Sequence, residues 1–333
     1  MKAIVQEVYG GPEVLHFADV PMPVLRPRDL LVRVHAISVN PVDTKVRGGG
    51  PAGTPVAQTP MILGWDAAGV VEQVGLEVTR FQPGDAVFFA GDITRTGSYA
   101  EYVAVDERIA GHKPQSLPFE AAAAVPLTAL TAWEGMFEQL GIDPLAPTRP
   151  ILIVGGAGGV GSIAVQIAAR VAGRHVVATA SRAESADYAR AMGAAAIIDH
   201  RHDFAPQVAE LGLSGFDHIF STARLENFGQ LVSVLNPLGT ICLILSGPAS
   251  QALDVSGLMA IRGTVTWELM FTRPRLGIEP ERQGQILDRV ADLLDAGVLV
   301  STQTQVFSWR DMAEAHRRLE TGHTIGKIVL AVD

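Results

Sequence analysis

Apolar residues between about positions 150 and 245 fall into short runs that alternate with helical patterns. The first run, at 151–154, has four apolar residues in succession, which is typical of a strand buried on both faces of a parallel sheet. Alternation of such strands with helices predicts a parallel sheet with helices on both faces. We expect the strands at 151–154, 175–180, 196–198, 218–220 and 240–245, and helices beginning near 162, 184, 204 and 227.

The first 120 residues have a different pattern. Short, partly alternating apolar stretches at 30–39, 67–74, 85–89 and 98–105 are separated by glycine and proline, which predicts a small, partly open β-barrel. Beyond the alternating region, an apolar stripe predicts a helix at 281–296. A helix at 308–319 and a strand at 327–332 follow, and the strand most simply returns to the barrel. We therefore expect two domains, residues 1–122 with 301–333 and residues 123–300.

Composition excludes several classes of protein. The net charge of −9 over 333 residues argues against nucleic-acid binding, which requires a basic face. A strand pattern begins at the first residues, so we expect no signal peptide, and the longest apolar run is too short and interrupted to span a membrane. Cys242 is the only cysteine and lies in an expected buried strand, so it is expected to be an inert core thiol. We expect a cytoplasmic protein.

The glycine-rich segment after the first buried strand predicts a dinucleotide site. Gly156, Gly158 and Gly161 stand in the register in which the first glycine allows a tight turn, the second admits a pyrophosphate and the third lets helix and strand pack closely. The alternative is a purely structural turn, but the strand before it and the helix after it favour a Rossmann-type site. The residues assigned to cofactor binding here are Gly156, Ala157, Gly158, Gly159, Val160 and Gly161.

Five segments, at 38–45, 64–69, 83–85, 155–161 and 326–330, resemble those of the medium-chain dehydrogenases/reductases. More narrowly, the chain is similar to the zinc-independent quinone oxidoreductase branch and to sequences called zinc-type alcohol-dehydrogenase-like. The resemblance implies a GroES-like barrel domain beside the Rossmann domain, a small-molecule substrate and a homodimer that pairs through the strand near 263–268.

The resemblance also bears on zinc. Zinc alcohol dehydrogenases have a cysteine near the position of Asn40, a histidine at that of Trp65 and a cysteine near that of Leu127, and none of these ligands is present here. The stretch 90–99 also lacks the cysteines of their structural zinc loop. His200 and His202 are more simply solvated surface residues than a metal site. We therefore expect a metal-free enzyme.

The end of the second buried strand indicates which nicotinamide cofactor is used. A site for NAD usually has a carboxylate there, but this strand is followed by Ser181 and Arg182, which can bind a 2′-phosphate. The expected cofactor is therefore NADP(H), although Arg182 can alternatively form an ion pair with Glu184. Further residues are assigned to cofactor binding from their positions in relatives, and these are Thr128, His200, Ser246 and Lys327.

Without a metal the site has no Lewis acid, so the hydride acceptor must already be electrophilic, as quinones and α,β-unsaturated ketones are. We assign Asn40, Asp43 and Thr131 to the catalytic site; the alternatives are ordinary turn chemistry for Asn40 and a bond to its own helix for either Thr128 or Thr131. Asp66 is expected to anchor a loop. Candidates for an apolar substrate wall, which can equally be core residues, are Trp65, Trp267, Met270 and Phe271.

The stretch after the Asn40 loop lacks the tyrosine proton donor of related enoyl-thioester reductases, so an acyl-thioester substrate is disfavoured and water is the expected proton source. The leading hypothesis is an NADPH-dependent, metal-free reductase of quinones or activated enones. A metal-independent alcohol or aldehyde dehydrogenase is a second hypothesis, and a non-catalytic NADPH-binding protein is a third.

Overall fold

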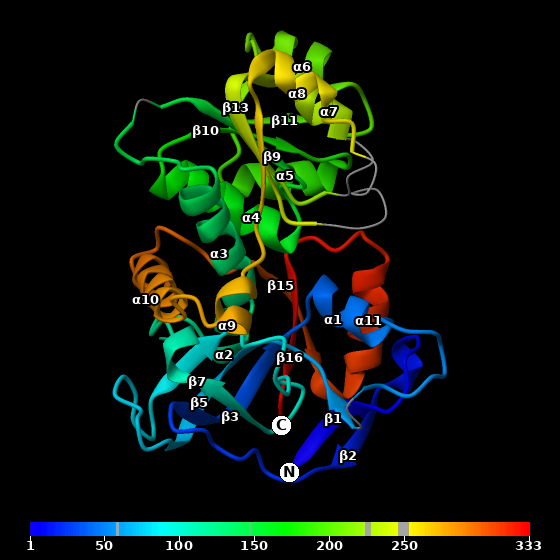
Figure 1. The fold of residues 1–333 in the computed structure, drawn as a ribbon, viewed down its shortest axis with the longest axis vertical. Helices are drawn as coiled ribbons and strands as arrows, with labels where there is room; N and C mark the ends of the chain where they lie inside the picture. The colour runs from blue at the N-terminus through cyan, green and yellow to red at the C-terminus, as the bar shows by residue number, and fades with distance from the viewer. Residues whose placement is uncertain (58–59, 147, 224–227, 246–252) are drawn as a thin grey trace. The chain divides into compact units, whose positions relative to one another are not determined.

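The computed structural model describes residues 1–57, 60–146, 148–223, 228–245 and 253–333. The chain forms two compact units, one of Met1–Leu130 with Phe271–Asp333 and the other of Thr131–Met270 (Figure 1). Each unit has its own sheet structure and is described separately below. Among the described residues, no helix has both the length and the hydropathy that crossing a bilayer requires.

The second unit contains a six-stranded sheet in which every neighbouring pair of strands is parallel. The spatial order is β11-β10-β9-β12-β13-β14, which is the order 3-2-1-4-5-6 of a doubly wound Rossmann sheet. The predicted fold class is thereby confirmed. The strands are β9 (Pro150–Val154), β10 (His175–Thr179), β11 (Ala196–Ile198), β12 (Phe216–Ser221), β13 (Leu235–Leu243) and β14 (Thr264–Trp267).

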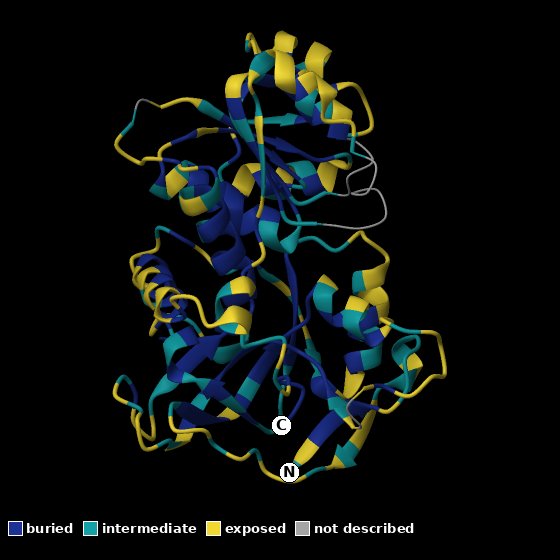
Figure 2. Cartoon of the chain, in the orientation of Figure 1, coloured by how far each residue is buried: buried dark blue, intermediate teal, exposed yellow. Residues whose placement is uncertain are grey.

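Helices follow the strands of this sheet as the alternating pattern predicts. Figure 2 shows the sheet interior buried and the outer helix faces exposed. One difference concerns β13, which begins at Leu235 although Pro237 and Gly239 make the start of this segment look like a turn. The strand accommodates them with a register shift against β12 and a positive φ of 66° at Leu238. The helices are α4 (Gly159–Gln166) with its π-helical continuation Ile167–Val171, α5 (Ala183–Met192), α6 (Phe204–Glu210), α7 (Phe228–Ser233) and α8 (Ser256–Ile261).

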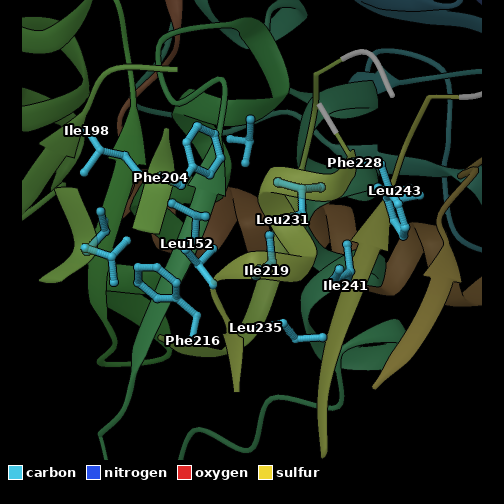
Figure 3. Packing of buried hydrophobic residues seen from close by; sticks show 14 of the residues in the cluster. Leu152, Ile198, Phe204, Phe216, Ile219, Phe228, Leu231, Leu235, Ile241 and Leu243 are labelled. Atoms are coloured by element: carbon cyan, nitrogen blue, oxygen red, sulfur yellow. The ribbon is translucent and has the colours of Figure 1, made fainter. Parts of the chain in front are cut away.

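One apolar cluster fills the space between this sheet and the helices on one of its faces (Figure 3). Phe204 from α6 and Phe228 and Leu231 from α7 pack against Leu152 of β9 and Ile219 of β12. These side chains are almost fully buried, and burial of this kind contributes about 1.5–3 kcal/mol for each large apolar side chain. The cluster therefore holds the carboxyl ends of β9 and β10 in a fixed position, where the glycine-rich loop begins.

The first unit contains a seven-stranded sheet and a smaller three-stranded one. The larger sheet follows the path β15-β16-β3-β5-β6-β8 with β7 also paired to β3, and the smaller has the order β2-β1-β4. The last strand of the chain pairs antiparallel with β3, so the C-terminal segment is part of this unit. The strands are β1 (Lys2–Gln6), β2 (His16–Asp19), β3 (Asp29–Ser38), β4 (Met61–Ile62), β5 (Asp66–Val74), β6 (Ala86–Phe89), β7 (Tyr102–Asp106), β8 (Ala110–His112), β15 (Gln303–Ser308) and β16 (Lys327–Ala331).

Short helices connect these strands, and α3 contains the boundary between the two units. Helix α3 continues as a π-helix over Glu134–Gln139. The helices are the 3₁₀ turns η1 (Pro12–Val14), η2 (Glu107–Ile109) and η7 (Trp309–Asp311), and the α-helices α1 (Pro41–Arg47), α2 (Phe119–Ala123), α3 (Pro126–Trp133), α9 (Thr272–Leu276), α10 (Glu281–Asp295) and α11 (Met312–Glu320).

Helix α10 belongs to the first unit, whereas the sequence-based boundary placed it in residues 123–300. Its apolar stripe packs on β8 and η2. Asp288 on its surface accepts hydrogen bonds from Arg80 at 2.8 Å and from the backbone N–H of His112 at 2.9 Å. These partners lie far away in the sequence, and so the helical stripe alone did not indicate which sheet the helix would cover.

Candidate functional site

The glycine-rich loop of the second unit joins β9 to α4. Of its three motif glycines, Gly156 and Gly161 are closely packed and Gly158 is not. A Cβ at Gly161 would lie 2.0 Å from the carbonyl oxygen of Gly155, and one at Gly156 would lie 2.7 Å from the Cβ of Ala178. A Cβ at Gly158 would meet only the Gly155 oxygen, at 3.5 Å. Gly156 and Gly161 are therefore required for packing, whereas Gly158 leaves the loop open on its outer side.

Helix α4 begins directly after this open position, with Gly158 as its N-cap. Gly158, Gly159 and Val160 are half-buried, so this end of the helix is not covered by packing. The first N–H groups of a helix have no partner within it and attract anions. The loop therefore fits a pyrophosphate, with Gly156, Ala157, Gly158, Gly159, Val160 and Gly161 forming the cradle.

The second strand of the sheet is tied to the same loop. The hydroxyl of Thr179, at the end of β10, accepts a hydrogen bond from the N–H of Gly155 at 3.0 Å. The chain then passes through half-buried Ser181 to exposed Arg182, which is the N-cap of α5. The strand end thus presents a hydroxyl and a guanidinium group, and no carboxylate stands between Thr179 and Arg182.

Two other residues were assigned to cofactor binding, His200 and Ser246, and the structure describes only His200. His200 follows β11, is half-buried and has a pKa lowered by burial, which favours the neutral imidazole. Ser246 lies outside the described residues.

The first unit has its own cluster of buried polar side chains, around Asp66 at the start of β5. Asp66 accepts hydrogen bonds from the Asn40 amide at 3.1 Å and from the backbone N–H of Leu127 at 3.0 Å. The ammonium group of Lys327 lies 3.2 Å from the same carboxylate. Burial raises the pKa of Asp66 and lowers that of Lys327, and the attraction between the two groups opposes both shifts. The predicted loop anchor is thus also the partner of a buried cation.

The donors of this cluster are largely used within it. The Lys327 ammonium has three N–H groups and three oxygen partners, which are the Val39 carbonyl, the Asn40 amide oxygen and Asp66. The Asn40 amide nitrogen donates to the Ser38 carbonyl and to Asp66. Lys327, which the sequence assigned to the cofactor pyrophosphate, is only 4% exposed. The geometry therefore favours a role for Lys327 and Asn40 in holding the cluster together.

Asp43 connects this cluster to a second hydrogen-bonded chain. Its Oδ2 atom accepts from the backbone N–H of Asn40 at 2.8 Å and from the Tyr99 hydroxyl at 2.7 Å. The hydroxyl is also 3.0 Å from Nε2 of His316 on α11, and Nδ1 of that histidine is 2.8 Å from the Arg47 guanidinium. All of these side chains are buried.

The direction of each hydrogen bond in this chain follows from Arg47. A guanidinium can only donate, so Nδ1 of His316 accepts and Nε2 carries the proton. Nε2 then donates to the Tyr99 oxygen, whose own proton goes to Asp43. Burial lowers the pKa of His316 to about 3, in agreement with a neutral ring, and burial raises the pKa of Asp43 to about 7. The Oδ1 atom of Asp43 has no hydrogen-bond partner among the described residues, which suits a neutral carboxyl group.

Three residues lie around Asp66 at the positions where the zinc alcohol dehydrogenases have their zinc ligands. Asn40 and the backbone of Leu127 both donate to it, and Trp65 is its neighbour in the chain. An amide, an indole and an aliphatic side chain do not fit the nitrogen, thiolate and carboxylate ligands of zinc. Over the described residues, no group of three or more histidine, cysteine, aspartate or glutamate side chains is arranged to hold a metal ion.

The remaining assigned residues lie on α3 and on the segment after β14. The Thr128 hydroxyl donates to the carbonyl oxygen of Val125 in its own helix at 3.0 Å, as the alternative for this residue supposed, and Thr131 is 6% exposed. Of the four residues expected to form a substrate wall, Trp267 is 48% exposed, whereas Met270, Phe271 and Trp65 are buried. Trp65 and Phe271 meet edge to face with their ring centroids 6.1 Å apart.

Sequence reasoning missed Tyr99, His316 and Arg47. Tyr99 lies in an expected strand and His316 in an expected helix, where each looks like an ordinary residue of its element. Their contact spans 217 positions, and nothing local marks it. The Asn40 loop was the available signal, since a buried asparagine and aspartate three residues apart require partners.

Family comparisons cover both parts of the chain. The family described as alcohol dehydrogenase GroES-like domain matches residues 26–115, and the family described as zinc-binding dehydrogenase matches residues 192–330. A zinc-type alcohol dehydrogenase-like protein from Staphylococcus aureus strain MSSA476 is 39% identical over 91% of both chains.

Two solved structures are similar over nearly their whole length. The quinone oxidoreductase of Pseudomonas syringae pv. tomato DC3000 is 30% identical with a TM-score of 0.85, covering 99% of both chains. The Escherichia coli quinone oxidoreductase in complex with NADPH is 25% identical with a TM-score of 0.85, covering 99% of this chain and 100% of that one. Residues 26–115 of the first unit thus match the GroES-like family.

The glycine loop leads to a first prediction, which compares two alanine variants. Gly161→Ala places a methyl group 2.0 Å from a backbone oxygen, and we expect it to lower the free energy of unfolding by about 1–3 kcal/mol through overpacking. Gly158→Ala has room for its methyl group, so we expect it to fold normally but to bind NADPH at least about tenfold more weakly, because the methyl group occupies the pyrophosphate approach. Urea denaturation and fluorescence titration measure the two effects. Equal stability losses in both variants would contradict this reading of the loop.

A second prediction concerns Asp43 and pH. Its ordinary pKa of 3.8 is raised to about 7 in the folded chain, so between these values the folded state retains a proton that the unfolded state releases, and stability falls as pH rises. Asp43→Asn resembles the protonated acid and does not titrate. We expect the stability of the variant relative to the wild type to increase by roughly 1 kcal/mol per pH unit across this window and to level off above it.

Urea denaturation at several pH values within and above the window measures this difference. Asp19→Asn is the matched control because the Asp19 side chain is 82% exposed. A difference between Asp43→Asn and wild type that stays constant with pH would show that the Asp43 carboxyl is ionised throughout.

Proposed function

Because this chain belongs to the medium-chain dehydrogenase/reductase superfamily and is an oxidoreductase of that type, we propose that it is a metal-free, NADPH-dependent reductase of quinones or α,β-unsaturated ketones. The observation that carries the proposal is the set of side chains at the zinc-ligand positions. Asn40, Trp65 and Leu127 surround Asp66 there, and none of the three supplies a zinc ligand. A site of hydrogen-bond donors and apolar groups suits an acceptor that is already electrophilic.

The choice of NADPH rests on the end of β10. Ser181 and Arg182 stand where a site for NAD usually has a carboxylate, and a guanidinium binds a phosphate with charge-assisted hydrogen bonds. When bound, NADPH supplies the hydride. The glycine loop holds the pyrophosphate, while Thr128, His200 and Ser246 are further proposed contacts. The relative from Escherichia coli that was solved with NADPH supports this assignment.

In the first unit we propose that Asn40, Asp43 and Lys327 act by positioning. Their polar atoms are bonded mainly to one another and to Asp66, so they fix the turn before α1 and the start of β16. Thr131, a residue of α3 that belongs to the second unit, is a separate proposed contact for the reacting carbonyl. Trp65 and Phe271 of the first unit, which meet edge to face, are the proposed apolar wall for a planar acceptor.

We also propose a homodimer. Among the described residues, strand β14 lies at the edge of its sheet and pairs with β13 alone, and Trp267 at its end is 48% exposed. An exposed apolar edge is a ready pairing surface. Light scattering of the purified protein distinguishes a dimer from a monomer.

The activity is tested by mixing the protein with NADPH and 9,10-phenanthrenequinone or an enone and following the absorbance of the reduced cofactor. We expect turnover that a metal chelator leaves unchanged and one-to-one loss of NADPH with acceptor. Simple alcohols with the oxidised cofactor are expected to give no reduction. Turnover of alcohols alone would favour the dehydrogenase alternative, and NADPH binding without any turnover would favour a non-catalytic protein.

Cofactor preference gives a further prediction. Arg182→Ala removes one or two charge-assisted hydrogen bonds to the 2′-phosphate, so we expect KM for NADPH to rise roughly 10–100-fold and KM for NADH to stay within about twofold. Arg190→Ala on the same helix is the control, because Arg190 is exposed and pairs with Asp187. Equal effects of Arg182→Ala on both cofactors would overturn the phosphate assignment.

A further inference from the structure

Close to Gly64 and Asp66, two buried side chains have a donor without a hydrogen-bond partner among the described residues, the indole of Trp65 and the hydroxyl of Ser98. The amide of Asn40, the ammonium of Lys327 and the hydroxyl of Tyr99 all donate to protein acceptors. The indole N–H of Trp65 is buried and has no hydrogen-bond partner among the described residues. Such donors are uncommon in folded proteins, and the indole N–H of Trp309 in the same unit is another.

The indole is held rigidly. Gly64 before it has a φ of +88°, and a Cβ there would lie 2.1 Å from the ring of Tyr99, so only glycine fits. The Ser98 N–H donates to the Gly64 carbonyl at 2.7 Å, and Asp66 after the indole is fixed by its own partners. Phe271 packs against the ring edge to face, and Trp65 itself is only 4% exposed. Such a donor is preorganised, since its position is set before any ligand binds.

The position of Trp65 in the chain also indicates a role for its indole N–H. Trp65 occupies the position at which the zinc-dependent relatives have a histidine ligand, and its neighbour Asp66 binds the residues at the other two positions. In those enzymes the metal draws charge from the substrate oxygen. A hydrogen-bond donor can perform the same task, and the Trp65 indole is an unpaired donor held rigidly at this position.

We propose that the indole N–H of Trp65 donates a hydrogen bond to the acceptor oxygen on which negative charge develops, which makes Trp65 a catalytic residue. The inference rests on the proposed reductase function. Hydride adds to the acceptor carbon, the π electrons move onto the oxygen, and NADPH becomes NADP⁺. The indole keeps its proton throughout, and the proton that completes the product comes from water.

The test compares Trp65→Phe with wild type under the quinone and enone assay. Phenylalanine keeps an aromatic ring and removes the donor, so we expect kcat to fall about 100-fold, as for loss of one oxyanion donor, with the Kd for NADPH within about twofold. Trp309→Phe is the matched control. Trp309 is 2% exposed, packs on Phe17 in the same unit and lies outside the proposed site, so it loses similar volume and is expected to keep full kcat.

A spectroscopic measurement separates catalysis from packing. The chain has four tryptophans, so the ¹⁵N indole resonance absent from Trp65→Phe identifies Trp65. We expect that resonance to shift when a saturated ketone is added to wild type with NADP⁺, and the other three to stay in place. Wild-type kcat in Trp65→Phe, or an unmoved resonance in an active enzyme, would overturn the inference. If wild type and Trp309→Phe are both inactive toward every acceptor, the proposed function itself fails and the inference with it.

Discussion

The buried ion pair between Asp66 and Lys327 fixes the arrangement of several segments of the first unit. One carboxylate receives the start of β16 through Lys327, the turn before α1 through Asn40 and the start of α3 through Leu127. Two charges in a dry environment are tolerated only when each is fully hydrogen-bonded. Removing one partner of such a pair typically costs about 3–5 kcal/mol, because the remaining charge is left uncompensated. The positions of these segments are therefore linked and cannot drift independently.

A series of hydrogen bonds from Asp43 through Tyr99 to His316 fixes further side chains next to this ion pair. Arg47 fixes the histidine tautomer, the histidine fixes the direction of the Tyr99 hydroxyl, and Tyr99 fixes Asp43. Burial, and to a smaller extent the charge of Asp66, raises the pKa of Asp43 to about 7, so below that pH the cluster avoids a second negative charge close to the first. Burial, and then the charge of Arg47, lowers the pKa of His316. Burial also raises the pKa of Asp43, so both shifts disfavour the charged form. Polar groups buried at this depth hold a single geometry because each has little choice of partner.

The sequence predicted well those features that depend on neighbours in the chain. The glycine loop could be read because strand, turn and helix follow one another, and the structure shows the backbone oxygen of Gly155 that excludes a side chain at Gly161. Lys327 and Asp66 are 261 positions apart in the sequence. The sequence pattern therefore predicted a strand at or next to each residue but not that the two residues pair. The same holds for helix α10, whose ion pair with Arg80 spans 208 positions, and for β13, where a turn-like sequence is absorbed into a strand by pairing with β12.

Replacing metal ligands with Asn40, Trp65 and Leu127 changes what chemistry such a site can support. An ammonium that already binds three oxygens contributes charge to the cluster but has no open coordination position for a substrate, unlike a catalytic zinc. In the proposed metal-free reductase, hydrogen-bond donors would stabilise a developing oxyanion, and one neutral donor stabilises it less than a dication does. The proposed conjugated carbonyl acceptors are already electrophilic and supply part of this stabilisation themselves, which unactivated ketones do not.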